Sequence, residues 1–221
     1  MKKTRQRNLE ILKEFITLCE DHNLWYSLDN FTLLGAIRHS GYVPWEEVNE
    51  VMMSPESFMI LQRNFPKKLA TISNNIKIKD LCAYFVGDIY DVERPQPYIK
   101  IRVAVPTSWK SIKKYRSKIT RISNVVKQRK INIKTSINAL RVKRYEGYLM
   151  LEKRNQNTRK TWIKVMCGER KEIKFHNLKV KVPIEYERIL ENWFGDKYME
   201  SKVPKYVNNY VSPILKEKEQ L

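Results

Sequence analysis

Three carboxylates lie close together in the sequence, at Glu46, Glu47 and Glu50, directly after a loop that contains Gly41 and Pro44. Carboxylate oxygens are the ligands that Mg²⁺ and Mn²⁺ take up at sites of phosphate chemistry. A regular strand would place Glu46 and Glu50 on one face with Cα atoms roughly 13 Å apart, and would turn Glu47 to the other face. The carboxylates could therefore serve one metal ion only if a local bulge brings two of them together.

A second group of residues with chemical potential is a long basic stretch from Arg94 to Tyr145. It carries sixteen Lys or Arg residues and no Asp or Glu, and it supplies most of the net charge of +19. Such a surface attracts phosphate groups, so its candidate ligands are an anionic membrane surface, a phosphate-bearing substrate and nucleic acid, beside a plain solvated face. Nucleic acid ranks last, because the sequence contains no RNP pattern, zinc finger or convincing helix-turn-helix.

The cysteines and histidines argue against two other kinds of site. Cys19, Cys82 and Cys167 are an odd number, are widely spaced and form no CxxC pair. They predict neither a disulfide framework nor a zinc site, and they fit a reducing compartment. The basic N-terminus is followed by no apolar core of a signal peptide, and no apolar run approaches the length of a membrane span. We therefore expect a cytoplasmic protein, with a peripheral position at the inner membrane face as a further possibility.

Hydrophobic spacing predicts the elements that position these residues in the first half of the chain. Apolar residues recur at three- and four-residue spacing in the helical segments, and β-branched and aromatic residues dominate the strands. Ser54 followed by Pro55 is a typical helix start, and Pro66 should lie beyond the end of that helix. The expected elements are a helix over 8–22, a strand over 25–28, a helix over 32–38, a strand over 48–53, a helix from Pro55 to Phe65, and strands over 76–78, 83–86 and 98–103.

The second half is expected to contain a helix over 109–126, a hairpin-like segment over 175–180, and a helix that begins at Pro183, runs through Trp193 and is closed by Gly195. We divide the chain into a core over 1–108, a basic helical segment over 109–170 and a C-terminal closing segment over 171–221. With 221 residues and 42% hydrophobic content, these parts are expected to form one compact domain.

Two separated blocks of the sequence resemble the LicD family of phosphocholine transferases, which is related to the fukutin-like proteins. The first block runs from Trp25 to Asp29 and from Thr32 to Trp45. The second covers 175–183 and 193–199, and it looks like the closing segment of that family. The two blocks occur in the order that the family has, which makes a chance resemblance improbable.

The resemblance implies a nucleotidyltransferase-like α+β fold, a small mixed sheet flanked by helices, here with a basic helical insertion. It implies transfer of phosphocholine, with Mg²⁺ or Mn²⁺, from a CDP-choline-like nucleotide donor to a glycan or lipid-linked glycan acceptor, as in the decoration of surface glycans or teichoic acid. Carried over onto this sequence, the family pattern assigns catalysis to Glu50 with Glu47, metal binding to Glu50 with Glu46, and substrate binding to Thr32, Gly35, Arg38 and Lys100.

The chain departs from the family pattern at the metal ligands. The first expected ligand falls on Val48, the second on Glu50 and the third on Lys100. Glycines expected before Thr32 are replaced by Asn30 and Phe31. A Lys at the third position opposes a divalent cation while the number of ligands falls. We therefore predict a catalytically degenerate LicD-like protein, a pseudoenzyme.

Two alternatives stay open at this point. The protein could be an active, metal-dependent phosphocholine transferase that uses Glu50 with Glu47 or Glu46. It could instead be a non-catalytic module that binds anions, with Lys100 holding a phosphate in place of a metal, or that regulates an active paralogue. The first alternative has further acidic residues to draw on, at Asp88, Asp91 and Glu93.

Overall fold

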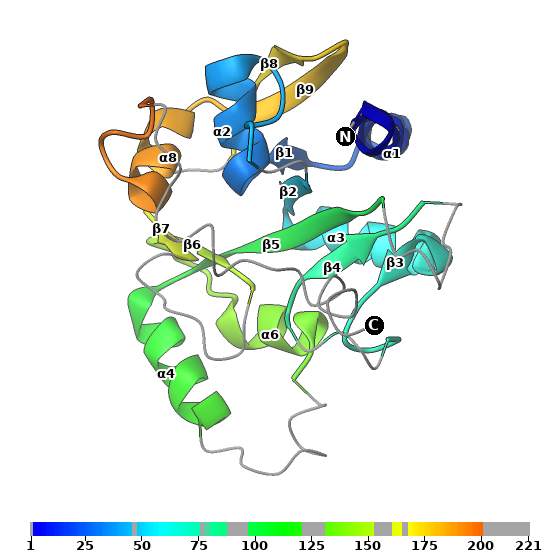
Figure 1. The fold of residues 1–221 in the computed structure, drawn as a ribbon. Coiled ribbons are helices and arrows are strands. Elements are labelled where there is room, and N and C mark those ends of the chain that lie inside the picture. The colour runs from blue at the N-terminus through cyan, green and yellow to red at the C-terminus, as the bar shows by residue number, and fades with distance from the viewer. Residues whose placement is uncertain are drawn as a thin grey trace, which may run out of the picture.

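A computed structural model describes residues 2–45, 48–75, 78, 80–87, 97–120, 131–152, 161–164 and 168–200. Helices and strands alternate through the first half and mix again in the second (Figure 1). In the first half the elements are α1 (Lys2–Asp21), β1 (Tyr26–Leu28), α2 (Asn30–His39), β2 (Asn49–Met53), α3 (Pro55–Asn64), the 3-10 helix η1 (Pro66–Lys68), β3 (Leu69–Ala70), β4 (Ala83–Phe85) and β5 (Ile99–Thr107). In the second half they are α4 (Trp109–Thr120), α6 (Ile133–Leu140), β6 (Gly147–Met150), β7 (Trp162–Ile163), β8 (Arg170–Phe175), β9 (Leu178–Pro183) and α8 (Tyr186–Phe194).

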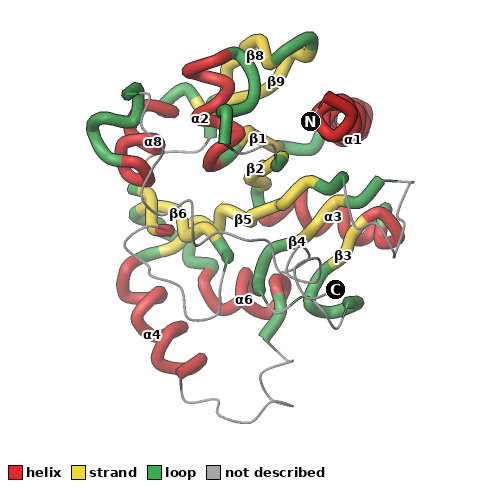
Figure 2. Tube along the Cα trace, viewed as in Figure 1, coloured by secondary structure: helices red, strands yellow, loops and turns green. Residues whose placement is uncertain are grey.

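These elements form a mixed seven-stranded sheet and a separate two-stranded hairpin, β8–β9. The order of the sheet is β1-β2-β5-β4-β3, and β6 joins it by pairing with both β5 and β7. Helices α2 and α8 lie on one side of the sheet and α4 and α6 lie on the other (Figures 1 and 2). The predicted α+β class, a mixed sheet flanked by helices, is therefore confirmed.

Strand β5 is the centre of the sheet. Its first half pairs in parallel with β2 and antiparallel with β4, and its second half pairs antiparallel with β6. This register places Lys100 directly between Glu50 on β2 and Tyr84 on β4. Strand β1 runs antiparallel to β2, and the Asp29 N–H continues this pairing by donating to the Glu50 carbonyl at 3.0 Å. A row of polar residues thus crosses the middle of the sheet.

Most of the predicted elements in the first half are present. The Ser54 hydroxyl accepts a hydrogen bond from the Ser57 N–H at 3.2 Å, as expected for the residue that caps α3. The helix ends at Asn64, before Pro66. Of the strand expected over 76–78 only residue 78 is described, so this prediction lies largely outside the described residues. The short strand β3 was not predicted, because two residues are too few to show a period.

The basic segment contains strands as well as helices. Helix α4 begins at Trp109 as predicted and is described to Thr120, and the remainder of the expected helix lies outside the described residues. Strand β6 pairs with the second half of β5, and β7 pairs with β6, so two strands of this segment extend the main sheet. Their four and two residues carry too short an alternation to identify a strand from the sequence.

The predicted start of the last helix was wrong. Pro183 ends strand β9, where it pairs with Arg170, and α8 begins only at Tyr186. A proline at the end of an edge strand is tolerated because its missing N–H is not needed there, and pairing with β8 prevails over the helix-start pattern. The predicted closure was right, since Gly195 follows the helix with a φ of 86°.

Gly35 permits a close approach between α2 and the loop that follows it. A Cβ atom at this position would lie 2.3 Å from the Gly41 carbonyl oxygen and 2.9 Å from the Val43 nitrogen, both of which are backbone atoms. We expect Gly35→Ala to lower the free energy of unfolding by about 1 to 3 kcal/mol, because the loop must move to make room. Urea denaturation measures this loss, with Gly168→Ala as the control, since a Cβ atom there meets nothing within 4 Å. Equal stability of the two variants would contradict the close approach.

Candidate functional site

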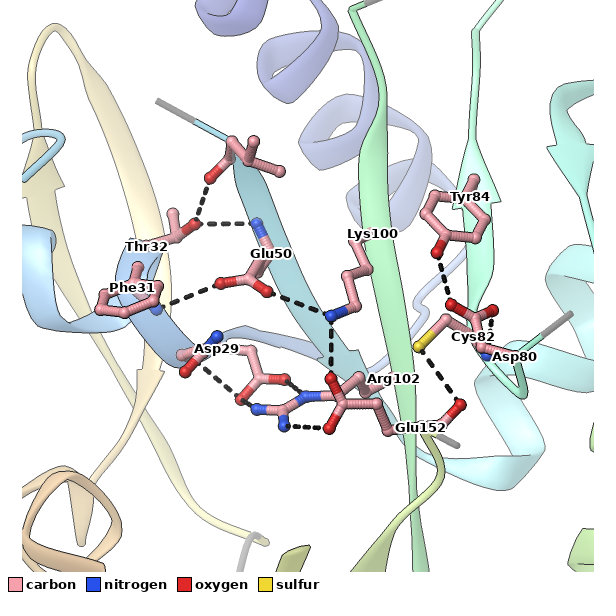
Figure 3. A network of polar contacts seen from close by, with 12 residues as sticks. Asp29, Phe31, Thr32, Glu50, Asp80, Cys82, Tyr84, Lys100, Arg102 and Glu152 are labelled. Carbon is pink, nitrogen blue, oxygen red and sulfur yellow. Dashed lines mark hydrogen bonds and ion pairs between the residues drawn. The ribbon is translucent and has the colours of Figure 1, made fainter. Parts of the chain in front are cut away.

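The start of β2, where the family resemblance places its metal ligands, is fastened to the start of α2 by Thr32. The Thr32 hydroxyl donates to the Val48 carbonyl at 2.9 Å and accepts from the Glu50 N–H at 2.8 Å (Figure 3). One side chain thus fixes the backbone on both sides of Asn49. The Phe31 N–H in the first turn of α2 donates to Glu50 Oε2 at 3.2 Å, so the helix start also orients the carboxylate.

Lys100 occupies the position beside this carboxylate. Its ammonium Nζ lies 3.5 Å from Glu50 Oε1 and 3.0 Å from Glu152 Oε1, so it bridges two acidic side chains (Figure 3). Glu152 lies two residues after the end of β6, the strand that pairs with β5, and its carboxylate reaches Lys100. Lys100, which the family resemblance predicts at a metal-ligand position, therefore forms two ion pairs of its own.

A second pair lies beside the first on the same face of β5. The Arg102 guanidinium binds Asp29 through two hydrogen bonds, from Nε to Oδ2 at 2.5 Å and from Nη2 to Oδ1 at 2.7 Å. Its Nη1 lies 3.8 Å from Glu152 Oε2, which joins the two pairs. Arg102 also lies over the Trp193 ring of α8, with its Cζ 4.8 Å from the ring centroid. We refer to Asp29, Glu50, Lys100, Arg102 and Glu152 as the ion-pair network.

Burial and the neighbouring charges act against each other on the pKa values of Glu50 and Lys100. The side chains of Glu50, Lys100 and Arg102 are 4%, 7% and 6% exposed, and Asp29 is fully buried. Burial raises the pKa of the Glu50 carboxyl above its ordinary value of 4.5, against the opposing charges of Lys100 and Arg102. Burial also works against the Lys100 ammonium, but Glu152 and Glu50 outweigh it and raise the pKa of Lys100. Lys100 therefore holds its charge firmly, and Glu152 is its closer counter-ion.

A smaller polar cluster adjoins the network on the β4 side. The Tyr84 hydroxyl donates to Asp80 Oδ2 at 2.7 Å, and the Cys82 N–H donates to Asp80 Oδ1 at 3.2 Å. Burial raises the pKa of the Asp80 carboxyl above its ordinary value, while the Tyr84 hydrogen bond opposes the shift. In both clusters, donors of the protein itself thus bind the carboxylate oxygens.

Two of the predicted substrate-binding residues, Gly35 and Arg38, make their contacts outside the network. Gly35 faces the loop after α2, as described above. The Arg38 guanidinium lies over the Trp45 ring, with Cζ 5.5 Å from the centroid, and Nη1 is 3.4 Å from the Tyr198 carbonyl oxygen. Thr32 and Lys100 both contact Glu50, Thr32 at its backbone N–H and Lys100 at its carboxylate. Their roles toward a substrate stay predictions.

The predicted catalytic and metal-binding acids can be placed only in part. Glu50 lies in the network, whereas Glu46 and Glu47 are outside the described residues, as are Asp88, Asp91 and Glu93. Within the part of the chain that is described, no three His, Cys, Asp or Glu side chains are grouped as a metal site would require. Glu50 with an ammonium 3.5 Å away does not fit Mg²⁺ or Mn²⁺, because the positive charge opposes the ion and occupies the carboxylate.

Sequence reasoning missed three members of the network, Asp29, Arg102 and Glu152. Arg102 carried a usable signal, since it lies two residues after Lys100 on a predicted strand and so shares its face. Asp29 precedes α2 and accepts from the Asn30 N–H at 2.9 Å, which is typical of a residue before a helix. Glu152 had no signal, because it lies 52 residues from Lys100 along the chain.

The raised pKa of Glu50 gives a prediction for stability against pH. The folded carboxyl binds its proton more tightly than the unfolded one, so wild-type stability should fall as pH rises from 4.5 through the raised pKa. Glu50→Gln cannot titrate and should lack this fall. The stability of the wild type relative to Glu50→Gln, measured by urea denaturation from about pH 5 to about pH 8, should therefore decrease with pH. If the stability of the wild type relative to Glu50→Gln instead increases with pH, ion pairing and not burial determines the direction of the Glu50 pKa shift.

The exposed surface of α4 is mostly basic. Ile112, Tyr115 and Ile119 are buried against the core, and the Tyr115 hydroxyl donates to the Ser136 hydroxyl of α6 at 2.6 Å. The opposite positions are exposed and almost all cationic, namely Lys110, Lys113, Lys114, Arg116 and Lys118. In the described residues no helix combines the length and the apolarity needed to cross a bilayer.

Comparison with known proteins gives an informative match. No family model matches the chain. The chain is 32% identical over 81 residues to the lipopolysaccharide cholinephosphotransferase LicD of Haemophilus influenzae. The match covers 37% of this chain and 31% of that relative, so it spans about a third of each. The chain thus resembles the LicD family, as the two sequence blocks predicted.

Proposed function

We propose that this protein is a LicD-like protein that serves the decoration of surface glycans or teichoic acid with phosphocholine, and that it lacks metal-dependent catalysis. One observation carries the proposal: the Lys100 ammonium lies between Glu50 and Glu152, at 3.5 and 3.0 Å, where the family resemblance expects a metal-coordinating carboxylate. A buried ion pair thus takes the place of the divalent cation in a nucleotidyltransferase-like core. The protein would retain recognition of a CDP-choline-like donor or of a glycan acceptor without transferring the phosphocholine group.

Two features support a loss of catalysis in particular. The carboxylates of the network are paired within the protein itself, because Lys100 and Arg102 form ion pairs with Asp29, Glu50 and Glu152. Entry of a divalent ion would leave an ammonium buried beside it, which costs several kcal/mol. The network therefore disfavours metal binding more strongly than the missing carboxylates alone would.

Calorimetric titration with CDP-choline tests this proposal, once with EDTA and once with Mn²⁺. We expect the same affinity in both solutions and no release of cytidine monophosphate, because the donor is bound without a metal. Binding that requires Mn²⁺, or Mn²⁺-dependent release of cytidine monophosphate, would contradict the proposal. That outcome would instead support the active transferase, with Glu50 assisted by Glu47 or Glu46.

We further propose that the exposed face of α4 docks on an anionic membrane surface, where a lipid-linked glycan acceptor would lie. The cations on this face and the absence of Asp and Glu from α4 support this placement. Regulation of an active paralogue is the alternative, and nucleic acid is the weaker rival, since charge alone supports it.

Vesicle binding tests the docking face with a matched control. Lys113→Gln/Lys114→Gln should weaken binding to vesicles of phosphatidylcholine with phosphatidylglycerol by roughly 1 kcal/mol per lysine. Lys174→Gln/Lys179→Gln removes the same charge from the β8–β9 hairpin and should leave binding almost unchanged. Equal losses for the two variants would mean that net charge, and not the α4 face, attracts the membrane. Co-sedimentation at physiological salt measures both.

A further inference from the structure

A pocket outside the ion-pair network lies where the start of α4, the edge strand β7 and α8 meet. Its volume is about 530 Å³, and its lining combines two indole rings with charged and amide groups. The residues used below are Trp109, Trp162, Lys164, Arg188, Glu191 and Asn192. Figure 1 shows α8 on one side of β7 and α4 on the other, so three separate parts of the chain build this site.

The two indoles form an inclined corner that the fold holds in place. Their ring centroids are 6.1 Å apart and their planes meet at 55°. Trp162 is fixed by strand pairing with Leu149. At the start of α4 the backbone N–H of Trp109 donates to Glu146 Oε2 at 3.2 Å. Trp109 nevertheless remains 38% exposed. Inclined rings present two faces to a compact cation, whereas a flat base stacks on parallel faces.

The charges around this corner match a ligand that carries both signs. Arg188, Glu191 and Asn192 share one face of α8 by their spacing of three and four residues, and Lys164 follows β7. Two cations and one carboxylate therefore surround two aromatic faces. Arg188 contacts Glu185 at 3.5 Å with 66% of its side chain exposed, so this contact is weak and leaves the guanidinium able to turn toward an anion.

We propose that this pocket binds a phosphocholine group. The quaternary ammonium lies against the faces of Trp109 and Trp162 with Glu191 as counter-charge, and the phosphate meets Lys164 and Arg188. This ligand identity rests on the proposed function, whereas the pocket and its chemistry are independent of it. Helix α8 also carries Trp193, whose ring lies under Arg102, so one helix borders both the pocket and the ion-pair network.

Tryptophan fluorescence with phosphocholine as the probe tests the pocket. We expect saturable quenching, with choline and inorganic phosphate each binding about tenfold more weakly because each satisfies only half of the site. Trp109→Ala and Arg188→Ala, read by calorimetry, should each weaken phosphocholine about tenfold. Tyr145→Ala removes an aromatic residue that is 46% exposed and does not line the pocket, and it should bind as the wild type does.

Three outcomes would overturn the pocket assignment. They are the absence of saturable phosphocholine binding, unchanged affinity in folded Trp109→Ala and Arg188→Ala, and Trp109-dependent binding of cytidine in preference to phosphocholine. The failure of the pocket is distinct from that of the proposed function. Metal-independent binding of CDP-choline whose affinity is the same in the wild type, Trp109→Ala and Arg188→Ala would refute the pocket alone. Turnover of CDP-choline with Mn²⁺, together with weakening by both variants, would refute the loss of catalysis and leave the pocket in place.

Discussion

The Lys100→Met variant is expected to lose about 3 kcal/mol of unfolding free energy. Methionine keeps the apolar stem and removes the ammonium, so Glu50 and Glu152 lose the cation that lies 3.5 and 3.0 Å from them. Their side chains are only 4% and 15% exposed, and water cannot replace the lost partner fully. Removing one member of a buried pair costs far more than the pair itself contributes, because the remaining charge stays desolvated.

Urea denaturation of three variants separates this effect from simple loss of charge. Lys143→Met removes an exposed lysine and should change stability by less than about 0.5 kcal/mol. Lys100→Met/Glu152→Gln should recover about half of the loss, since the closer counter-ion is then neutral. A loss below about 1 kcal/mol in Lys100→Met, with no recovery in the double variant, would contradict the account of a closed ion-pair network.

The second large effect is a gain of metal affinity in Val48→Asp/Lys100→Asp. Val48 lies two residues before Glu50, and Lys100 is paired with Glu50 across β2 and β5. The carboxylate introduced at Val48 would thus lie two residues before Glu50 along the chain. The one introduced at Lys100 would lie opposite Glu50 on the neighbouring strand β5. Together they change the charge around an ion by three units, which favours Mn²⁺ on the order of 100-fold or more.

Single variants show whether the gain needs both changes. Val48→Asp alone should bind Mn²⁺ little better than the wild type, because Lys100 still pairs with Glu50. Lys100→Asp alone should give an intermediate affinity. Calorimetry with Mn²⁺ measures all three, and circular dichroism checks that each is folded. A folded double variant without any gain would mean that Val48 and Lys100 do not correspond to the metal ligands of the LicD family.

The sequence predicted those features of the fold that are indicated by residues close together along the chain. Ser54 and Pro55 predicted the start of α3, and the β-branched run around Lys100 predicted β5. Val48 and Lys100, at positions where the family resemblance expects carboxylates, indicate an altered metal site from their residue types alone. Capping and periodicity act between residues within a few positions of one another, which is why such signals can be read along the chain.

The compensation between charged residues was not predictable in the same way. Lys100 pairs with Glu50 because β2 and β5 run parallel in one particular register. No local sequence pattern indicates either the strand pairing or its register. Asp29 and Arg102 are 73 residues apart. Glu152 reaches both cations from just beyond β6, a strand that is too short to be recognised in the sequence. The sequence predicted missing metal ligands, and the structure adds that Lys100 has two counter-ions, Glu50 and Glu152.

The two buried cations also matter for the stability of the fold. Burying several carboxylates without a cation would be very unfavourable, because each charge loses its water and finds no partner. Lys100 and Arg102 provide positive charge from within the chain, through ion pairs with Asp29, Glu50 and Glu152. Buried pairs of this kind add little net stability compared with apolar packing, and their effect here is to hold β2, β5 and the start of α2 in a fixed arrangement.

The most direct test of this account is calorimetric titration of the wild-type protein with Mn²⁺ and Mg²⁺, alone and with CDP-choline present. We predict no saturable heat of metal binding in either solution, because the Lys100 ammonium lies between Glu50 and Glu152 and repels a divalent cation there. Stoichiometric metal binding that appears on addition of CDP-choline would contradict the account, since it would show that Glu50 and a neighbouring acid still build a working metal site.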